Sequence, residues 1–206
     1  RLPVSFVVIE FVGKFAFALS GIPLASAKQF DIFGAWIVGM ATAIGGGTLR
    51  DLLLGVNPFW MTNGSYFICC AIAVLWVMAF QKYLVRQDNT WFIFDTIGLA
   101  LFNVIGIEKA WTMGLPHWTA ITMGCITGAA GGVIRDVLIN DVPLIFRKEI
   151  YALACVAGGL VYAACIYLNL SAEVAALLSS AVVILTRCLA VKYHWHQPVL
   201  KGDHIE

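Results

Sequence analysis

The sequence predicts an all-α integral membrane protein, and three observations support this: its composition, its long apolar runs and a duplicated motif. The chain has 206 residues, of which 61% are hydrophobic and only 12% are charged, and its mean hydropathy is +0.87. Soluble domains contain about 45–50% apolar and about 25% charged residues. We therefore expect a lipid bilayer to surround the protein. The net charge of +1 gives no reason to expect nucleic-acid binding.

Seven apolar runs are long enough to cross a bilayer, which takes about 20 residues of helix. No linker, low-complexity segment or soluble domain interrupts the sequence, so we expect a single transmembrane domain over residues 1–206 with seven helices. The predicted helices cover residues 3–27, 31–55, 64–84, 91–113, 116–139, 149–168 and 171–192.

A motif in the second predicted helix occurs again in the fifth. GGGTLRD at 45–51 is matched by AGGVIRD at 130–136, 85 positions later. The same offset relates many other positions without a gap, which indicates an internal duplication. The further matches are Gly13 with Gly98, Phe17 with Phe102, Gly21 with Gly106, Gly39 with Gly124, Pro58 with Pro143, Tyr66 with Tyr151 and Cys70 with Cys155.

The duplication divides the chain into two repeats of three helices. Repeat one covers about residues 3–84 and repeat two about 91–168, while the helix at 171–192 has no counterpart. Because three is an odd number of crossings, the second repeat must enter the membrane from the opposite face. We therefore predict two inverted three-helix repeats plus a seventh helix, a design that usually places the site near the bilayer midplane between corresponding helices.

The basic residues of the loops predict the orientation, because positively charged loops stay in the cytoplasm. This rule places the N-terminus outside and the C-terminus in the cytoplasm. The predicted cytoplasmic side carries Lys28, Lys82, Arg86, Arg147, Lys148, Lys192 and Lys201, and the other side carries Arg1 and Lys109.

The glycines of the duplicated motif are candidate pore residues: Gly45, Gly46 and Gly47 in the second helix, and Gly131 and Gly132 in the fifth. Glycine weakens a helix, and lipid offers no partner for the backbone groups that a break sets free. We interpret the glycines as kinks that line a wet path, where carbonyl oxygens can bind an alkali cation. Close helix packing through small residues is the alternative interpretation.

Four charged residues follow these glycines: Arg50, Asp51, Arg135 and Asp136. Charges within a membrane are costly and mark functional sites. Neighbours on a helix point about 100° apart, so an arginine and the adjacent aspartate are not expected to share one partner. We predict cross-repeat pairs, Arg50 with Asp136 and Arg135 with Asp51, which can coexist with a role at the pore.

Further charges lie in the first and fourth predicted helices. Glu10 and Lys14 have the i, i+4 spacing of a helical ion pair, and Asp95 occupies the place of Glu10 in repeat two. Glu10 and Asp95 are candidate cation entrances, or else charges at the depth of the interface. Glu108 and Lys109 are expected to be solvated at a helix end.

Nothing in the sequence indicates an enzyme, because it contains no HExxH, GxSxG or phosphate-binding loop. We expect no cofactor and no metal site, and we interpret the cysteines as small buried hydrophobic residues. Small residues in the last two predicted helices, including Gly158, Gly159 and Ser179, permit close helix approach within or between protomers. The cysteines are Cys69, Cys70, Cys125, Cys155, Cys165 and Cys188.

The duplicated GGGxxRD and GGxxRD motifs within three-plus-three-plus-one helices resemble the bacterial trimeric intracellular cation (TRIC) channels, a family also described as glycine transporters. The resemblance covers nearly the whole chain. It implies a homotrimer in the bacterial inner membrane, with one potassium-permeable pore per protomer between the two glycine-kinked helices and K⁺ or Na⁺ as the permeant ion. A secondary transporter of a small zwitterion such as glycine is the alternative, and a scaffold protein is a third hypothesis.

Overall fold

The structure is a computed structural model that describes residues 4–62, 64–84, 90–147 and 150–195, and every described element is helical. Among the basic residues used to predict the orientation, Arg1, Arg86, Lys148 and Lys201 lie outside these ranges. The elements are α1 (Val4–Ala27), α2 (Ile32–Leu53), α3 (Phe59–Thr62), α4 (Gly64–Leu84), α5 (Thr90–Thr112), α6 (His117–Leu138), η1 (Leu144–Phe146), α7 (Ala152–Tyr167) and α8 (Ala172–Lys192).

The long helices agree with the apolar runs of the sequence to within a few residues at most ends. By length and composition, α1, α2, α5, α6 and α8 can each cross a membrane. Shorter apolar helical stretches occur at Cys70–Phe80 in α4 and at Ala152–Tyr167 in α7. The described part of the chain is therefore helical and has the apolar helices of a membrane protein, while seven membrane spans stay a prediction.

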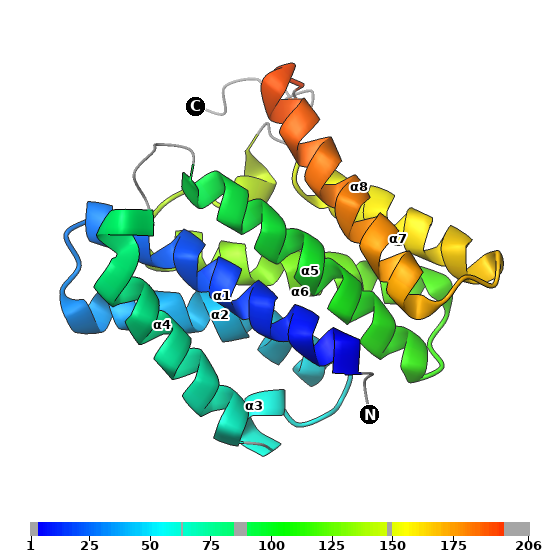
Figure 1. The fold of residues 1–206 in the computed structure, drawn as a ribbon, viewed down its shortest axis with the longest axis horizontal. Helices are drawn as coiled ribbons and strands as arrows, with labels where there is room; N and C mark the ends of the chain where they lie inside the picture. The colour runs from blue at the N-terminus through cyan, green and yellow to red at the C-terminus, as the bar shows by residue number, and fades with distance from the viewer. Residues whose placement is uncertain (1–3, 63, 85–89, 148–149, 196–206) are drawn as a thin grey trace, which may run out of the picture.

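The first helices of the two repeats, α1 and α5, lie side by side and run antiparallel (Figure 1). Phe17 of α1 stacks on Phe102 of α5, its equivalent at the 85-residue offset, with ring centroids 5.1 Å apart. Gly13 faces the Phe102 ring, and its equivalent Gly98 faces the Phe17 ring. The two contacts are equivalent at the 85-residue offset: Gly13 of α1 meets Phe102 of α5, and Gly98 of α5 meets Phe17 of α1. The packing of α1 on α5 is therefore locally symmetric, with the two helices running in opposite directions.

The second helices, α2 and α6, also cross antiparallel, with their backbones in contact at two glycines. A Cβ atom added to Gly46 would lie 2.2 Å from the carbonyl oxygen of Thr127. A Cβ added to Gly131 would lie 2.6 Å from the carbonyl oxygen of Thr42, the equivalent of Thr127. The glycines therefore allow the backbones of α2 and α6 to come closer than any residue with a side chain would permit. This is the packing role of small residues in membrane helices.

The helices α2 and α6 remain α-helical through their glycines, so the helix is not interrupted there. The kinks at these glycines stay a prediction. Thr42 and Thr127 each donate their hydroxyl hydrogen to the carbonyl four residues earlier, at 2.6 and 2.5 Å. This bond satisfies the hydroxyl donor of the threonine and tends to bend a helix without interrupting it. Each glycine costs about 1 kcal/mol relative to alanine in a helix, and the close contact between α2 and α6 that the glycines permit opposes this cost.

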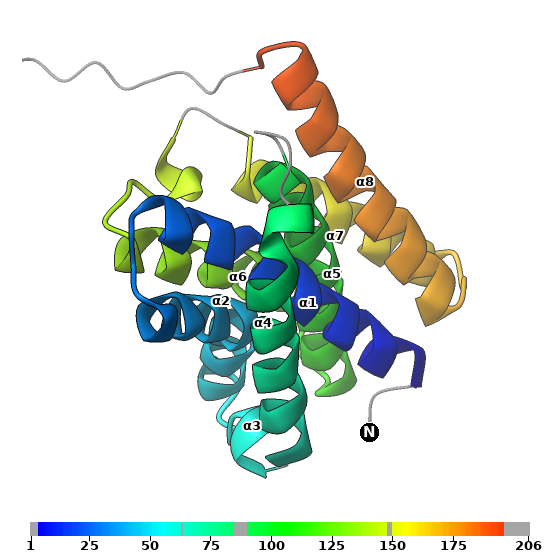
Figure 2. The same cartoon turned by 60° about the vertical axis from the view of Figure 1, so that its left-hand side comes forward.

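Two sides of the bundle are built differently around the α1–α5 pair. The helix α4 packs on α1 and α2, whereas α7 and α8 pack together against α5, with α8 on the outside (Figures 1 and 2). The Ser179 hydroxyl of α8 donates to the Gly158 carbonyl of α7 at 2.8 Å. The small residues of these two helices thus serve packing within the protomer.

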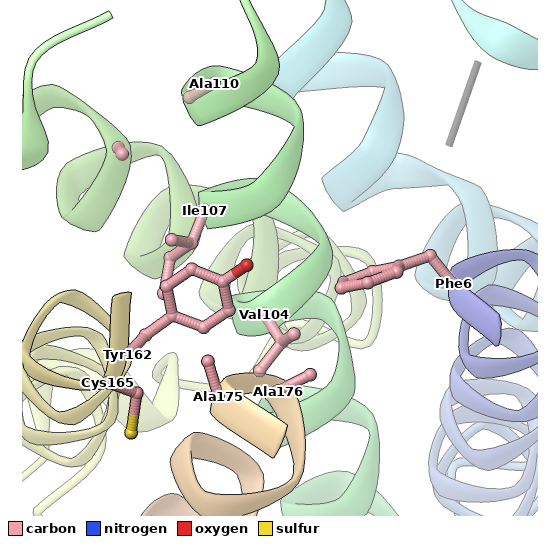
Figure 3. Packing of buried hydrophobic residues seen from close by; sticks show 9 residues of the cluster. Phe6, Val104, Ile107, Ala110, Tyr162, Cys165, Ala175 and Ala176 are labelled. Atoms are coloured by element: carbon pink, nitrogen blue, oxygen red, sulfur yellow. The ribbon is translucent and has the colours of Figure 1, made fainter. Parts of the chain in front are cut away.

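The ends of α5, α7 and α8 enclose an apolar cluster that also receives Phe6 from α1 (Figure 3). Tyr162 of α7 lies within it, and its hydroxyl points toward α5, where it donates to the buried carboxylate of Glu108. The prediction that Glu108 is solvated is therefore wrong. The fold buries this carboxylate because a tyrosine from another helix supplies its hydrogen bond, which a buried polar group requires.

The N-terminus of α2 gives a test of local stability. The Asp31 side chain accepts a hydrogen bond of 2.7 Å from the Gly34 amide, whereas its equivalent Pro116 makes no such bond at the start of α6. We expect Asp31→Ala to destabilise the protein by about 1 kcal/mol, the usual cost of losing an N-cap. Thermal unfolding in detergent measures this, and Pro116→Ala, which removes no cap bond, is the control. An equal loss in both variants would contradict the capping role.

Candidate functional site: two buried charge clusters

The first charge cluster consists of Arg50, Asp51 and Lys109, at the C-terminal ends of α2 and α5. The Asp51 carboxylate is fully buried, and its Oδ1 accepts from Arg50 Nε and from Lys109 Nζ, both at 2.7 Å. Its Oδ2 accepts from the Phe59 backbone amide at 2.9 Å. Asp51 therefore joins α2 to α5 and anchors the start of α3. Two cations and an amide compensate its burial, as a charge in a membrane requires.

A second ion pair lies beside the first cluster. Lys14 Nζ lies 3.4 Å from Glu10 Oε1 within α1, and both side chains are buried. This confirms the predicted i, i+4 pair. The Lys14 ammonium also lies 4.1 Å from the centre of the Phe59 ring, a cation–π contact. Phe59 thus contacts Lys14 through its ring and Asp51 through its amide, so it links the Glu10–Lys14 pair to the first cluster.

The second charge cluster consists of Asp95, Arg135, Asp136 and Arg187, all of them buried. Asp95 Oδ1 accepts from Arg135 Nη1 at 2.6 Å, and Asp95 Oδ2 accepts from Arg187 Nη1 at 2.7 Å. Arg135 also donates through Nε to Asp136 at 2.8 Å and through Nη1 to the Ser20 hydroxyl of α1 at 3.1 Å. The cluster therefore connects α1, α5, α6 and α8.

The two clusters share one local design at the 85-residue offset. In each, an arginine donates through Nε to the aspartate that follows it, and that aspartate accepts an amide hydrogen eight residues later: Phe59 bonds Asp51, and Leu144 bonds Asp136 at 3.1 Å. The turns after the helices match too, with Gly55 and Asn140 at φ values of 69° and 55°. The duplicated sequence thus forms the same aspartate-anchored turn twice.

The predicted cross-repeat pairs, Arg50 with Asp136 and Arg135 with Asp51, are wrong. The four residues lie in the last turns of α2 and α6, and these helices run antiparallel, so the two Arg–Asp dipeptides lie at opposite ends of the crossing. Each long arginine side chain instead folds back onto its neighbouring aspartate. The 100° divergence of adjacent residues did not prevent this, because the arginine side chain is flexible enough to span that angle.

The candidate entrance residues are also buried. Asp95 has no exposed surface and binds two guanidinium groups, and Glu10 is 5% exposed and binds Lys14. In this conformation both carboxylates are compensated by cations within the bundle. Their role as entrances stays a prediction for another conformation. Lys109, expected to be solvated, binds Asp51 and is only partly exposed.

Four residues complete these clusters in roles that the sequence did not predict. Arg187 of α8 and Lys109 of α5 supply cations, and Ser20 accepts from Arg135. Tyr151 places its ring 4.6 Å from the Arg187 guanidinium carbon. Arg187 lies in the interior of the seventh predicted helix, whereas the other charges of that helix, Glu173 and Lys192, lie near its ends. A charge inside a membrane helix is itself a signal of a functional site.

The clusters lie near opposite ends of α5, because Lys109 belongs to the first cluster and Asp95 to the second. Fourteen residues of helix separate them, or roughly 20 Å at 1.5 Å per residue. Between them the bundle buries hydroxyl and amide groups of Ser20, Thr42, Asn103 and Thr127. Ser20 contacts the second cluster, whereas the threonine hydroxyls donate to carbonyls of their own helices and Asn103 donates to α7.

The comparisons with known proteins agree with this architecture. The family model described as Glycine transporter matches the chain twice, at residues 7–82 and 92–167, two segments that are also 85 positions apart. The UPF0126 inner membrane protein YadS of Escherichia coli is 37% identical over 202 residues, covering 95% of this chain and 96% of that protein.

Solved structures of TRIC channels share the fold. The TRIC trimeric intracellular cation channel orthologue from Rhodobacter sphaeroides has a TM-score of 0.87 at 31% identity, over 93% of this chain and 100% of that chain. Another structure, described in a study of conductance through TRIC cation channels, has a TM-score of 0.84 at 33% identity, over 97% of this chain and 98% of that chain. The chain thus belongs to the glycine transporter (UPF0126) family of membrane proteins and has the fold of the bacterial TRIC channels.

Proposed function

We propose that this protein is a potassium-permeable monovalent cation channel that assembles as a homotrimer, with one pore in each protomer between α2 and α6. The observation that carries this proposal is the similarity to TRIC channels over more than nine-tenths of the chain, at TM-scores of 0.84 and 0.87 and above 30% identity. This similarity supports the same membrane architecture for this chain.

Within this proposal the chain is an inverted repeat of two three-helix units plus α8. The antiparallel packing of α1 on α5 and of α2 on α6 supports it, because equivalent helices of inverted repeats run in opposite directions across the membrane. The turns that recur at the 85-residue offset after α2 and α6 support it as well. The basic loops favour a cytoplasmic C-terminus.

The packing at Gly46 and Gly131 corresponds to a closed pore. No ion can pass between two backbones that lack room for a single methyl group. Conduction between α2 and α6 therefore requires these helices to separate at the crossing. Separation would uncover the Thr42 and Thr127 carbonyls that the glycines now cover, and backbone carbonyls are suitable ligands for a partly dehydrated alkali cation.

The two charge clusters would determine the electrostatic environment that a cation meets at the two ends of this path. Asp51 and Asp136 carry the negative charges nearest to the ends of α2 and α6, but each is compensated by the adjacent arginine. Such compensation is compatible with a modest preference for cations. It does not suggest a fixed ring of negative charge, which would bind a cation tightly.

A direct test of the proposal is single-channel recording of the purified protein in a planar bilayer with unequal KCl concentrations on the two sides. We expect unitary current steps and a reversal potential displaced toward that of K⁺. A native mass measurement from lipid or detergent, with the trimer as the expected species, tests the assembly. A stable monomer would contradict the proposed trimer.

Transport of a small zwitterion such as glycine is the second candidate function, favoured by the description of the matching family. Uptake of labelled glycine into proteoliposomes tests it on the same preparation. Saturable glycine uptake without unitary current would overturn the channel proposal, because a transporter moves too few charges per second to give resolved steps.

A further inference from the structure

Glu10 of α1 and Asp95 of α5, which are equivalent at the 85-residue offset, each hold a cation inside the bundle. Lys14 Nζ lies 3.4 Å from Glu10 Oε1, and Arg187 Nη1 lies 2.7 Å from Asp95 Oδ2. All four side chains are buried. A carboxylate at such a depth requires a partner of opposite charge, so both positions are places where the fold holds positive charge.

Aromatic rings complete the surroundings of the cation in repeat one. The Lys14 ammonium lies 4.1 Å from the centre of the Phe59 ring and 5.2 Å from the centre of the Phe11 ring. Both distances fall within the range of about 6 Å over which the face of a ring attracts a cation. The ammonium of Lys14 therefore lies among one carboxylate, that of Glu10, and two ring faces.

The second repeat has the same kind of site but takes its cation from elsewhere. The Arg187 guanidinium carbon lies 4.6 Å from the centres of the Phe92 and Tyr151 rings. At the 85-residue offset Lys14 corresponds to the apolar Leu99, so α8 supplies the cation instead. The carboxylate is duplicated and the side chain that carries the cation is not. The surroundings of the carboxylate thus favour positive charge whichever residue supplies it.

The Glu10 carboxylate retains capacity to bind a cation. Within the described part of the chain, Glu10 Oε1 accepts no hydrogen bond, and its 3.4 Å contact with Lys14 is an ion pair only. Asp95 differs, because it accepts hydrogen bonds of 2.6 and 2.7 Å from Arg135 and Arg187. The site at Glu10 is therefore the one of the two whose carboxylate oxygen has lone pairs left for another cation.

We infer that Glu10, Phe11 and Phe59 form a binding site for a small monovalent cation, either K⁺ or a primary ammonium ion, and that Lys14 fills this site as a tethered competitor. The ammonium group of lysine and K⁺ carry the same charge and are similar in size. Both are attracted by a carboxylate and by the face of an aromatic ring. Removal of the lysine ammonium should therefore leave a site that a free cation can occupy.

A consequence for conduction rests on the proposed function. If Glu10 lies along the path of the permeant ion, Lys14 lowers the apparent affinity of the site, because only the fraction of sites without the ammonium can bind. When Lys14 is absent from the site for one-tenth of the time, the affinity for K⁺ is reduced about tenfold. Lys14→Ala should then lower the KCl concentration that gives half-maximal current by about tenfold.

The binding test is chemical rescue of the full-length Lys14→Ala protein in detergent, and it does not depend on conduction. We expect methylammonium chloride or KCl to raise the Tm of this variant in a saturable way, and separate additions distinguish the two cations. Tetraethylammonium chloride, which is too bulky to lie between Glu10 and the rings, is the control for ionic strength. A ligand at ten times its Kd raises the folded-to-unfolded ratio about elevenfold. The parent protein, whose site is filled, should respond much less.

The matched control is the double variant Glu10→Gln with Lys14→Ala, which lacks the carboxylate and should show no rescue. Extraction with and without methylammonium covers a Lys14→Ala protein that folds only with a cation, because recovery in its presence alone is the same result. If Lys14→Ala fails to fold under both conditions, Lys14→Gln replaces it, since glutamine is uncharged and shorter than lysine.

The site is refuted if the small cations and tetraethylammonium give the same Tm, or if the double variant is rescued equally. A conducting protein whose half-maximal KCl concentration does not change in Lys14→Ala would overturn the competition between Lys14 and the permeant ion. Rescue in a protein that passes no current would instead refute the proposed channel and leave the cation site established.

Discussion

Gly46→Ala and Gly131→Ala are each expected to lower the stability of the protein by about 3 kcal/mol, the upper part of the range for overpacking a tight interior. The added Cβ atoms would lie 2.2 and 2.6 Å from carbonyl oxygens of the facing helix. Neither backbone can turn aside as a side chain can, so α2 and α6 must move apart. Alanine's better helix propensity returns only about 1 kcal/mol.

The control is Gly45→Ala, one position away on the same helix. There the new Cβ would meet Ile134 Cδ1, the end of a flexible side chain, at 2.6 Å. Ile134 can rotate away, so we expect a change below about 1 kcal/mol. Thermal unfolding in detergent compares the variants, with an expected decrease in Tm of roughly 5–10 °C for Gly46→Ala and Gly131→Ala.

Potassium flux through the same variants tests the proposed closed crossing. If the helices separate on opening, a side chain at Gly46 or Gly131 penalises the closed state more than the open one. Surviving Gly46→Ala protein should therefore conduct more often than the parent. A fully stable Gly46→Ala protein with unchanged flux would show that the α2–α6 backbones are not in contact and would refute the closed crossing.

Asp95→Asn should destabilise the protein by about 3–5 kcal/mol, the cost of breaking a buried ion pair from one side. The substitution leaves the Arg135 and Arg187 guanidinium groups in a fully buried site without the carboxylate they both bind. Arg135 keeps Asp136. Arg187 loses the carboxylate oxygen that its Nη1 binds, so most of the cost should arise there.

The double change Asp95→Asn with Arg187→Gln should recover much of this loss, because Arg135 and Asp136 then form a neutral pair. Asp141→Asn is the control at a partly exposed ion pair with Arg147, where we expect less than about 1 kcal/mol. Thermal unfolding of the four proteins measures the effects. A double variant less stable than Asp95→Asn would show that Arg187 stabilises the fold independently of Asp95.

Much of the fold could be predicted from the sequence, because the signals for membrane helices are local. A run of about 20 apolar residues has few alternatives in a bilayer, and the predicted segment 171–192 differs from α8 by one residue at its start. The 85-residue offset anticipated which positions would share a local structure. The equivalence extends to single hydrogen bonds. The Phe59 amide donates to Asp51, and the Leu144 amide donates to Asp136.

Part of the candidate site was predicted in its residues, but its contacts were not. The motif identified Arg50, Asp51, Arg135 and Asp136 as buried charges, and all four are buried in the structure. Their assignment to cross-repeat pairs failed, because the repeat relation says which positions are equivalent and not how far apart they lie. The antiparallel α2–α6 crossing places the two Arg–Asp dipeptides at opposite ends.

The sequence by itself determined the class of protein, the order and approximate limits of its helices, the duplication and several of the charged residues that find partners within the bundle, among them Arg50, Asp51, Arg135 and Asp136. These follow from hydropathy and from residue spacing along one chain. Only the tertiary structure decided which partners they find: Lys109 for Asp51, and Arg187 from α8 for Asp95. The same holds for the surroundings of Gly46 and Gly131, because glycine permits a close approach of helices and only the tertiary structure places a facing backbone beside them.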